Sequence, residues 1–162
     1  MAIELYNNIP QTGHVKWIGL RPERLKPVKV VDEVAVDDQS GLVGDRFSGK
    51  PRSTRMVTLI QAEHLPVIAS ILGRDEIDPA ELRRNIVVSG INLLSLKAPD
   101  DKFEFHIGTA VLQMTGNCHP CSRMEEQLGP GGFNAMRGHG GITATVIQSG
   151  KISVGDEVRL KV

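Results

Sequence analysis

The sequence predicts a mostly β protein that folds as a closed or nearly closed barrel with a few short helices. At least seven segments have the length and composition of β-strands, and little helical sequence separates them. Closing such a sheet into a barrel removes its exposed edges, which favours a barrel over an open sheet. A chain of 162 residues is long enough to bury its own core, so we expect one domain over residues 1–162.

The strand predictions follow runs of β-branched and alternating residues. The expected strands are residues 14–20, 28–37, 55–60, 85–90, 109–116, 141–150 and 155–162. The segment "SGKISVGD", between the last two, has turn residues at both ends and is predicted to be a tight β connection.

Three segments have helical features. Residues 61–73 place apolar side chains on one face and end at a glycine, although Pro66 must then lie in the first turn. Asp78 followed by Pro79 has the form of an N-cap with proline at the first helical position. Residues 122–129, "SRMEEQLG", again stop at a glycine. The glycine-rich stretch that follows, residues 129–141, is expected to be a flexible binding loop or a long turn.

Composition argues against several classes of partner. Nineteen basic residues balance nineteen acidic ones, and one Trp, one Tyr and four Phe provide few platforms for base stacking. We therefore expect no nucleic-acid or membrane partner. No apolar stretch is long enough to span a bilayer, and the N-terminus lacks the features of a signal peptide, so we expect a cytoplasmic protein.

Both cysteines lie in "GNCHPCSRMEEQLG", residues 116–129. A zinc site is disfavoured, because Cys118, Cys121, His119 and a distant His139 lack the usual second ligand pair. A dithiol redox pair is a second interpretation, since C-x-x-C at a helix start lowers a thiol pKa. In thioredoxin-like folds, however, that motif follows the first strand, whereas here it lies past residue 115.

Two interpretations of the cysteines remain. They could be small buried apolar residues, although their neighbours are polar and turn-forming. Alternatively, one of them is a reactive thiolate. Cys121 is better placed than Cys118, because it precedes a short helical segment with Arg123 nearby. Such a thiolate could attack an electrophile, carry sulfur or bind a soft metal.

Two further clusters could bind an anion. One holds Asp45 and Arg46 in the glycine-rich "GLVGDRFSG"; the other holds Arg83, Arg84 and Asn85 just before an expected strand. Arginine can hold an oxyanion with two parallel hydrogen bonds, and the rim of a barrel is a suitable place for it. The alternative for each cluster is a solvated loop with surface ion pairs.

Taken together, these stretches resemble a MOSC domain, the module named after the C-terminal part of molybdenum cofactor sulfurase. The matching pieces are "GLVGDRF", "RMVTLIQAEHL", "LRRNIVVSGINLLSLK", the cysteine segment and "MRGHGGITATVIQSGKISVGDEV". They follow the family's order from about residue 41 to residue 158. The resemblance is closest to the small, stand-alone bacterial members.

The resemblance implies a barrel related to that of pyruvate kinase and a pocket for molybdenum cofactor or a related sulfur- or metal-bearing ligand. It makes Cys121 the reactive residue and metal ligand. Its R-P-N motif stands here as R-R-N, so Arg83 and Asn85 match, and Arg84, which replaces the proline, is expected to be less important. The remaining residues expected around the cofactor are Asp45, Arg46, Arg55, Cys118 and His139.

Three functions fit this resemblance and the cysteine pair. The first is reduction of small N-hydroxylated substrates, with electrons from an external donor protein. The second is a persulfide carrier without catalytic turnover, and the third is a dithiol oxidoreductase that uses both cysteines. Pyridoxal phosphate is a further ligand that the resemblance admits.

Overall fold

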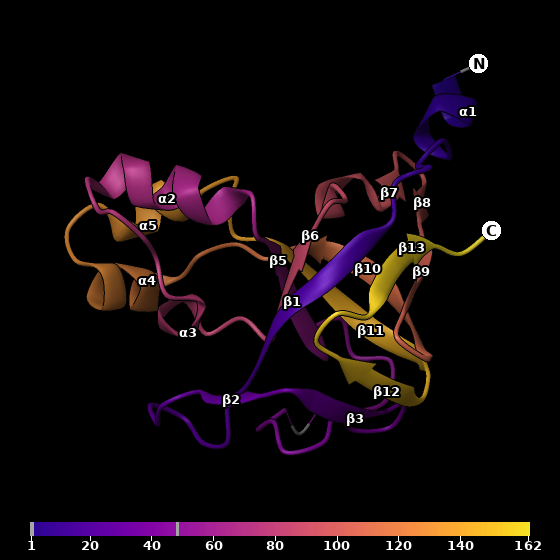
Figure 1. Cartoon of the computed structure of the whole chain (residues 1–162), viewed down its shortest axis with the longest axis horizontal. Helices are drawn as coiled ribbons and strands as arrows, with labels where there is room; N and C mark the ends of the chain where they lie inside the picture. Colours follow the sequence, from indigo (N-terminus) through magenta and orange to yellow (C-terminus); the bar gives the residue numbers. More distant parts are fainter. Residues whose placement is uncertain (1, 48) are drawn as a thin grey trace.

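In a computed structural model that describes residues 2–47 and 49–162, seven strands form a closed barrel (Figure 1). In order around the barrel they are β1 (Gly13–Leu20), β13 (Glu157–Leu160), β9 (Glu104–Ile107), β10 (Ala110–Asn117), β11 (Ile142–Gln148), β5 (Val57–Gln61) and β6 (Ile86–Ser89), which pairs back with β1. β2 (Lys29–Val31) extends the sheet beyond β1. The prediction of a mostly β barrel is therefore confirmed.

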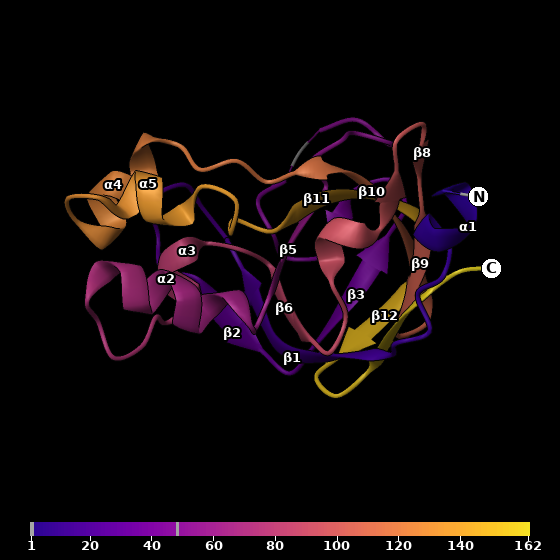
Figure 2. The same ribbon diagram turned by 90° about the horizontal axis from the view of Figure 1, so that it is seen from above.

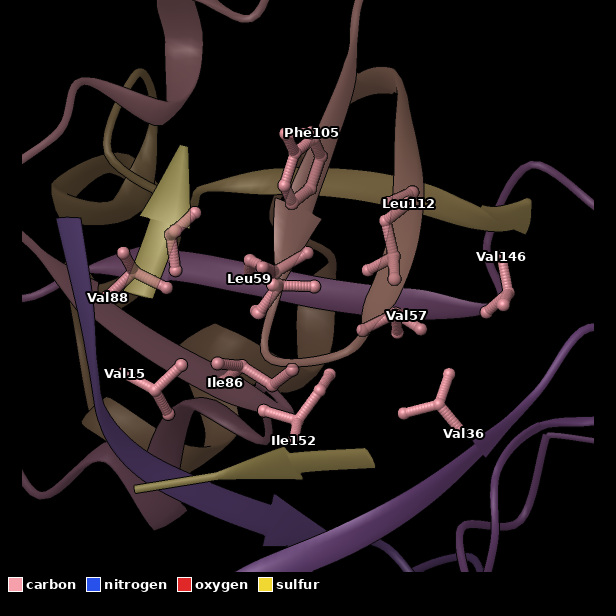
Figure 3. Packing of buried hydrophobic residues seen from close by; sticks show 14 of the residues in the cluster. Val15, Val36, Val57, Leu59, Ile86, Val88, Phe105, Leu112, Val146 and Ile152 are labelled. Carbon is pink, nitrogen blue, oxygen red and sulfur yellow. The ribbon is translucent and has the colours of Figure 1, made fainter. Parts of the chain in front are cut away.

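Two smaller sheets accompany the barrel. One has the order β12 (Gly150–Ser153), β3 (Glu33–Asp37) and β4 (Gly41–Leu42), and the other pairs β7 (Lys97–Ala98) with β8 (Asp101–Lys102). Val36 of β3 and Ile152 of β12 point into the barrel core in Figure 3, so the three-stranded sheet packs against the barrel interior.

The helices lie mainly on one side of the barrel. β5 and β6 are the one parallel pair in the described barrel, and a parallel pair requires a crossover connection. Here the crossover carries α2 (His64–Leu72) and α3 (Pro79–Leu82), which group with α4 (Ser122–Leu128) and α5 (Gly132–Met136) in both Figure 1 and Figure 2. We call these four helices the helical lobe.

Two further helical segments lie outside the lobe. They are α1 (Ala2–Tyr6) and the 3₁₀ helix η1 (Leu93–Ser95). Across the described part of the chain, every helix falls short of the length and apolar character needed to cross a membrane.

Strand alternation divides the apolar residues between two cores. Leu59, Ile86 and Val88 belong to the barrel core, shown in Figure 3, whereas their neighbours Ile60 and Val87 face the helical lobe. Successive side chains of a strand point to opposite faces, so β5 is buried at all five positions and β6 at its first three because both faces of each strand are covered. The helical lobe is thereby fixed to the barrel wall.

The three helix predictions are confirmed, with Asp78 capping α3 and Gly73 ending α2 in the left-handed region. Other predictions were wrong. "SGKISVGD" contains the strand β12, which pairs with β3 and buries Ile152. Residues 129–141 are not simply a loop, because they contain α5, whose Ala135 and Met136 pack in the helical lobe.

The expected strand 28–37 is two strands in different sheets. They separate at Asp32, whose carbonyl accepts a hydrogen bond from the amide of Val154 at 2.8 Å. β9 was not predicted, because a strand of four residues gives only a weak pattern. In the structure its residues alternate in burial, with Phe105 and Ile107 in the barrel core.

Candidate functional site

The cysteine segment joins β10 of the barrel to α4 of the helical lobe. The amide of Cys118 donates to the carbonyl of Gly141 at 2.8 Å, which ties the segment to the start of β11. Both thiols are free, but they differ in access: Cys118 is 3% exposed, whereas Cys121 is exposed at the N-cap of α4. The sulfur of Cys121 makes no capping hydrogen bond. Of the two thiols, Cys121 is the one that an external ligand can reach.

Arg84 is the charged residue buried next to this segment. It is 7% exposed, and its Nε and Nη1 donate to the carbonyls of Gly140 and Leu82, each at 2.8 Å. Its Nη2 has no hydrogen-bond partner. Burial lowers the pKa of Arg84, and the nearby Cys118 opposes that shift. The guanidinium is therefore held by neutral carbonyls, with one N–H group unused.

Glycine at residues 140 and 141 permits this close arrangement. A Cβ on Gly140 would stand 2.3 Å from the carbonyl oxygen of Cys118 and 3.2 Å from Nη2 of Arg84. Gly141 has a φ of +86°, and a Cβ there would stand 1.9 Å from the carbonyl oxygen of Leu59. Because these two residues have no Cβ, the backbone at residues 140 and 141 can lie directly against the cysteine segment, Arg84 and β5.

Arg55 also lies close to the buried thiol. Its Nη2 lies 3.9 Å from Sγ of Cys118, and its charge contributes to lowering the pKa of Arg84. Arg55 is itself exposed. Cys118 therefore lies next to one buried and one exposed guanidinium.

Arg83, the other arginine of the R-R-N segment, points elsewhere. It ends α3 with a φ of 55°, and its Nη1 donates to the carbonyl of Lys26 at 2.7 Å. Its pKa is lowered first by partial burial and then by the charges of Arg123, Arg21 and Arg46. Arg83 thus lies within the same cationic region, while its guanidinium is bonded to the loop between β1 and β2.

Asp45 and Asn85 belong to a buried network that we call the Asp45–Asn85 network. Arg21 pairs with Asp45 through Nη2–Oδ2 at 3.0 Å and Nε–Oδ1 at 3.2 Å. Asn85 Nδ2 donates to Asp45 Oδ1 and to the carbonyl of Gly19, both at 3.1 Å, and its Oδ1 accepts from Thr58 N and Oγ1. These bonds join the loop at residue 45 to β1, β5 and β6.

The charge of Asp45 depends on this network. Burial acts to raise the pKa of Asp45, but the hydrogen bonds and charge of Arg21 outweigh it, so the pKa is lowered overall. Asp45 and Asn85, two of the side chains expected around a cofactor, have their polar atoms engaged within the protein.

The two remaining candidates are Arg46 and His139, whose polar contacts are to groups other than the thiols. Arg46 is exposed, and its backbone amide donates to the carbonyl of Arg21 at 2.7 Å. His139 has Nδ1 at 3.2 Å from the carbonyl of Ala135, and its ring packs edge-on against His64 with centroids 5.4 Å apart. Burial, then the charge of His139, lowers the pKa of His64. His139 thus makes its contacts within the helical lobe.

The described residues contain no group of three His, Cys, Asp or Glu side chains arranged to hold a metal ion, so the zinc interpretation gains no support. A small cavity of about 80 Å³ lies beside Cys118 and is bordered by His119 and Gly140. A larger hollow of about 710 Å³ lies between Tyr6 and the β7–β8 hairpin. We place the candidate site at the smaller cavity, because Cys118 lines it and Gly140, which also borders it, accepts a hydrogen bond from the buried Arg84.

The sequence pattern of the MOSC domain matches residues 36–159. The chain belongs to the MOSC domain family. No sequence match was found among curated proteins.

Solved structures of the same fold support this assignment at the level of architecture. The YuaD protein of Bacillus subtilis has a TM-score of 0.78 and 21% identity, over 94% of this chain and 97% of that one. YiiM of Geobacillus stearothermophilus has a TM-score of 0.73 and 19% identity, over 93% and 75%. YiiM of Escherichia coli has a TM-score of 0.69 and 19% identity, over 92% and 70%.

Two residues near the site of this MOSC domain were not expected to matter from the sequence. Arg84 was placed in a candidate anion-binding cluster but expected to be less important than Arg83, because the family motif has proline there, although an arginine two residues before a buried strand was a visible signal. Arg21, the ion-pair partner of Asp45, carried no signal, because it follows β1 and is 24 residues away from that carboxylate.

Proposed function

We propose that this MOSC domain binds molybdenum cofactor at the cysteine segment and uses it to reduce N-hydroxylated compounds. Membership of the family indicates a binding function related to molybdenum cofactor. The observation that carries the finer proposal is the convergence of an exposed thiol, a buried thiol and a group of arginines on one small region.

The residues present fit such a cofactor. Its phosphate needs cationic hydrogen-bond donors, and Arg84 has a buried N–H group without a partner. Its metal needs a soft ligand, which the exposed Cys121 thiol can supply as a thiolate. The charged residues that act on Arg83 are three arginines, Arg123, Arg21 and Arg46, and one carboxylate, Asp45. That carboxylate is already paired with Arg21.

In this proposal Cys121 is the metal ligand, because it is the accessible thiol. Cys118 is buried, held by the hydrogen bond of its amide to Gly141 and contacted by Arg55. When bound, the molybdenum would supply two-electron oxygen-atom chemistry. The Asp45–Asn85 network fixes β6 and thereby the position of Arg84. Electrons would come from a separate donor protein.

The test is to measure molybdenum and pterin in protein purified from a host that makes the cofactor, alongside Cys121→Ser and Cys118→Ser variants. We expect near-stoichiometric cofactor in the wild type, severe loss for Cys121→Ser and a mild effect for Cys118→Ser. Cofactor near zero in the wild type would contradict the proposal. Equal and complete loss of activity in both variants would instead favour dithiol chemistry, because a dithiol mechanism needs both sulfurs.

Intact-mass measurement separates a further outcome, the persulfide carrier. A reducible mass increase of one sulfur atom on Cys121, without metal, would favour a carrier over the reductase. The exposed position of Cys121 is compatible with such a transfer, since a partner's persulfide could reach it.

A further inference from the structure

Arg84 is an arginine held in the interior without a carboxylate partner. It is 7% exposed, and the ion pairs formed by the described residues do not include it. Its two hydrogen bonds go to the neutral carbonyls of Leu82 and Gly140. Burying a charge is costly unless it is paired, so an unpaired buried guanidinium needs an explanation.

The unused Nη2 of Arg84 lies at the cysteine segment. Nη2 and the carbonyl oxygen of Cys118 both lie within 3.2 Å of the point where a Cβ on Gly140 would stand. The groups whose charges oppose the lowering of its pKa are Cys118 and Cys121. Two other arginines, Arg21 and Arg55, act on it in the opposite direction, so two further guanidinium groups lie within electrostatic range of Arg84.

Arg83 differs from Arg84 in two ways: both of its Nη atoms have hydrogen-bond partners, and its side chain is only partly buried. Its Nη1 and Nη2 donate to the carbonyls of Lys26 and Glu23, at 2.7 and 3.4 Å, so its guanidinium is committed to the loop between β1 and β2. Its positive φ of 55° turns the chain at the end of α3, so that the next residue enters the interior. The two adjacent arginines therefore have different tasks.

We propose that Arg84, not Arg83, binds the anionic end of the ligand, and that this end is a phosphate-class oxyanion. A tetrahedral oxyanion accepts hydrogen bonds from a guanidinium, and a dianion matches a region where positive charges outnumber negative ones. Arg83 supports the loop beside the site. The inference rests on the proposed function for the location of the site, and it names the residue and the ligand group.

The experiment uses inorganic phosphate as the probe and requires no cofactor. Isothermal titration and thermal melts would compare the wild type, Arg84→Met and Arg83→Met in phosphate against chloride of equal ionic strength. We expect phosphate to stabilise the wild type and Arg83→Met beyond the chloride control. For Arg84→Met we expect an affinity lower by roughly ten- to a hundredfold, the effect of removing a charge-assisted hydrogen bond.

A second pair of variants covers the case in which Arg84→Met fails to fold. Arg84→Lys keeps a buried cation but has no planar fork, so it should bind phosphate more weakly than Arg83→Lys does. Equal binding by these two variants, or phosphate that stabilises the wild type no more than chloride does, would overturn the inference. Phosphate binding without any molybdenum in protein from the cofactor-making host would keep this inference and refute the proposed function.

Discussion

Arg84 and Asn85 are adjacent and both buried, but only Asn85 has a hydrogen-bond partner for every polar atom of its side chain. The side chain of Asn85 accepts from Thr58 and donates to Gly19 and Asp45. Arg84 keeps one N–H group without a partner. A fully bonded buried group stabilises a fold, whereas an incompletely bonded one marks a place where something else can bind. The contrast separates residues that build the site from those available to a ligand.

The largest expected effect comes from removing the polar side chain of Asn85. Asn85→Leu should lower the free energy of unfolding by roughly 3–5 kcal/mol, because it leaves several buried groups without partners, including the amide of Thr58. Urea denaturation measures this. The control is Glu81→Gln, which weakens the exposed ion pair with Arg74 and should cost about 1 kcal/mol or less. A loss below about 1 kcal/mol for Asn85→Leu would mean that its side chain is free for a ligand.

The backbone around the thiols provides a second test. Gly141→Ala should destabilise by roughly 2–4 kcal/mol, because its φ is positive and the new Cβ would meet the carbonyl of Leu59. Gly155 also has a positive φ but has open space around it, so Gly155→Ala should cost only about 1–2 kcal/mol. Thermal or urea unfolding compares the two. Equal losses would show that the segment holding Cys118 can adjust without cost.

A smaller effect should appear in the pH dependence of the Asp45–Asn85 network. Because the pKa of Asp45 is lowered below its ordinary 3.8, its contribution to stability is present above that value and is lost as pH falls through the folded-state pKa. The stability difference between wild type and Asp45→Asn should therefore be largest near neutral pH and narrow below about pH 4. Urea unfolding at several pH values tests this. A difference that stays constant or widens in acid would contradict the assignment.

The elements that could be predicted from the sequence are those whose start or end is marked by neighbouring residues. The cap at Asp78, the proline after it and the glycine that ends α2 are read directly from neighbouring residues. β12 was missed because its strand character depends on pairing with β3, more than a hundred residues earlier. Pairing between distant segments has no signature in a short window.

The candidate site shows the same limit. The sequence predicted arginines and cysteines in one region, and the structure places Arg84 and Arg55 with Cys118. Which of the two arginines in R-R-N enters the interior depends on the positive φ of Arg83 and on the carbonyl of Gly140, 56 residues away from Arg84. Neither is visible in the motif itself.

The closure of the barrel has a consequence for how the chain acquires its fold. β1 is completed by β13, with Gly13 opposite Val158, so the ring cannot close until both ends of the described chain are available. During synthesis, β1 and β9 would each keep an unpaired edge until β13 has been made. Pairing of segments so distant in sequence makes folding slow and leaves those edges open to other chains.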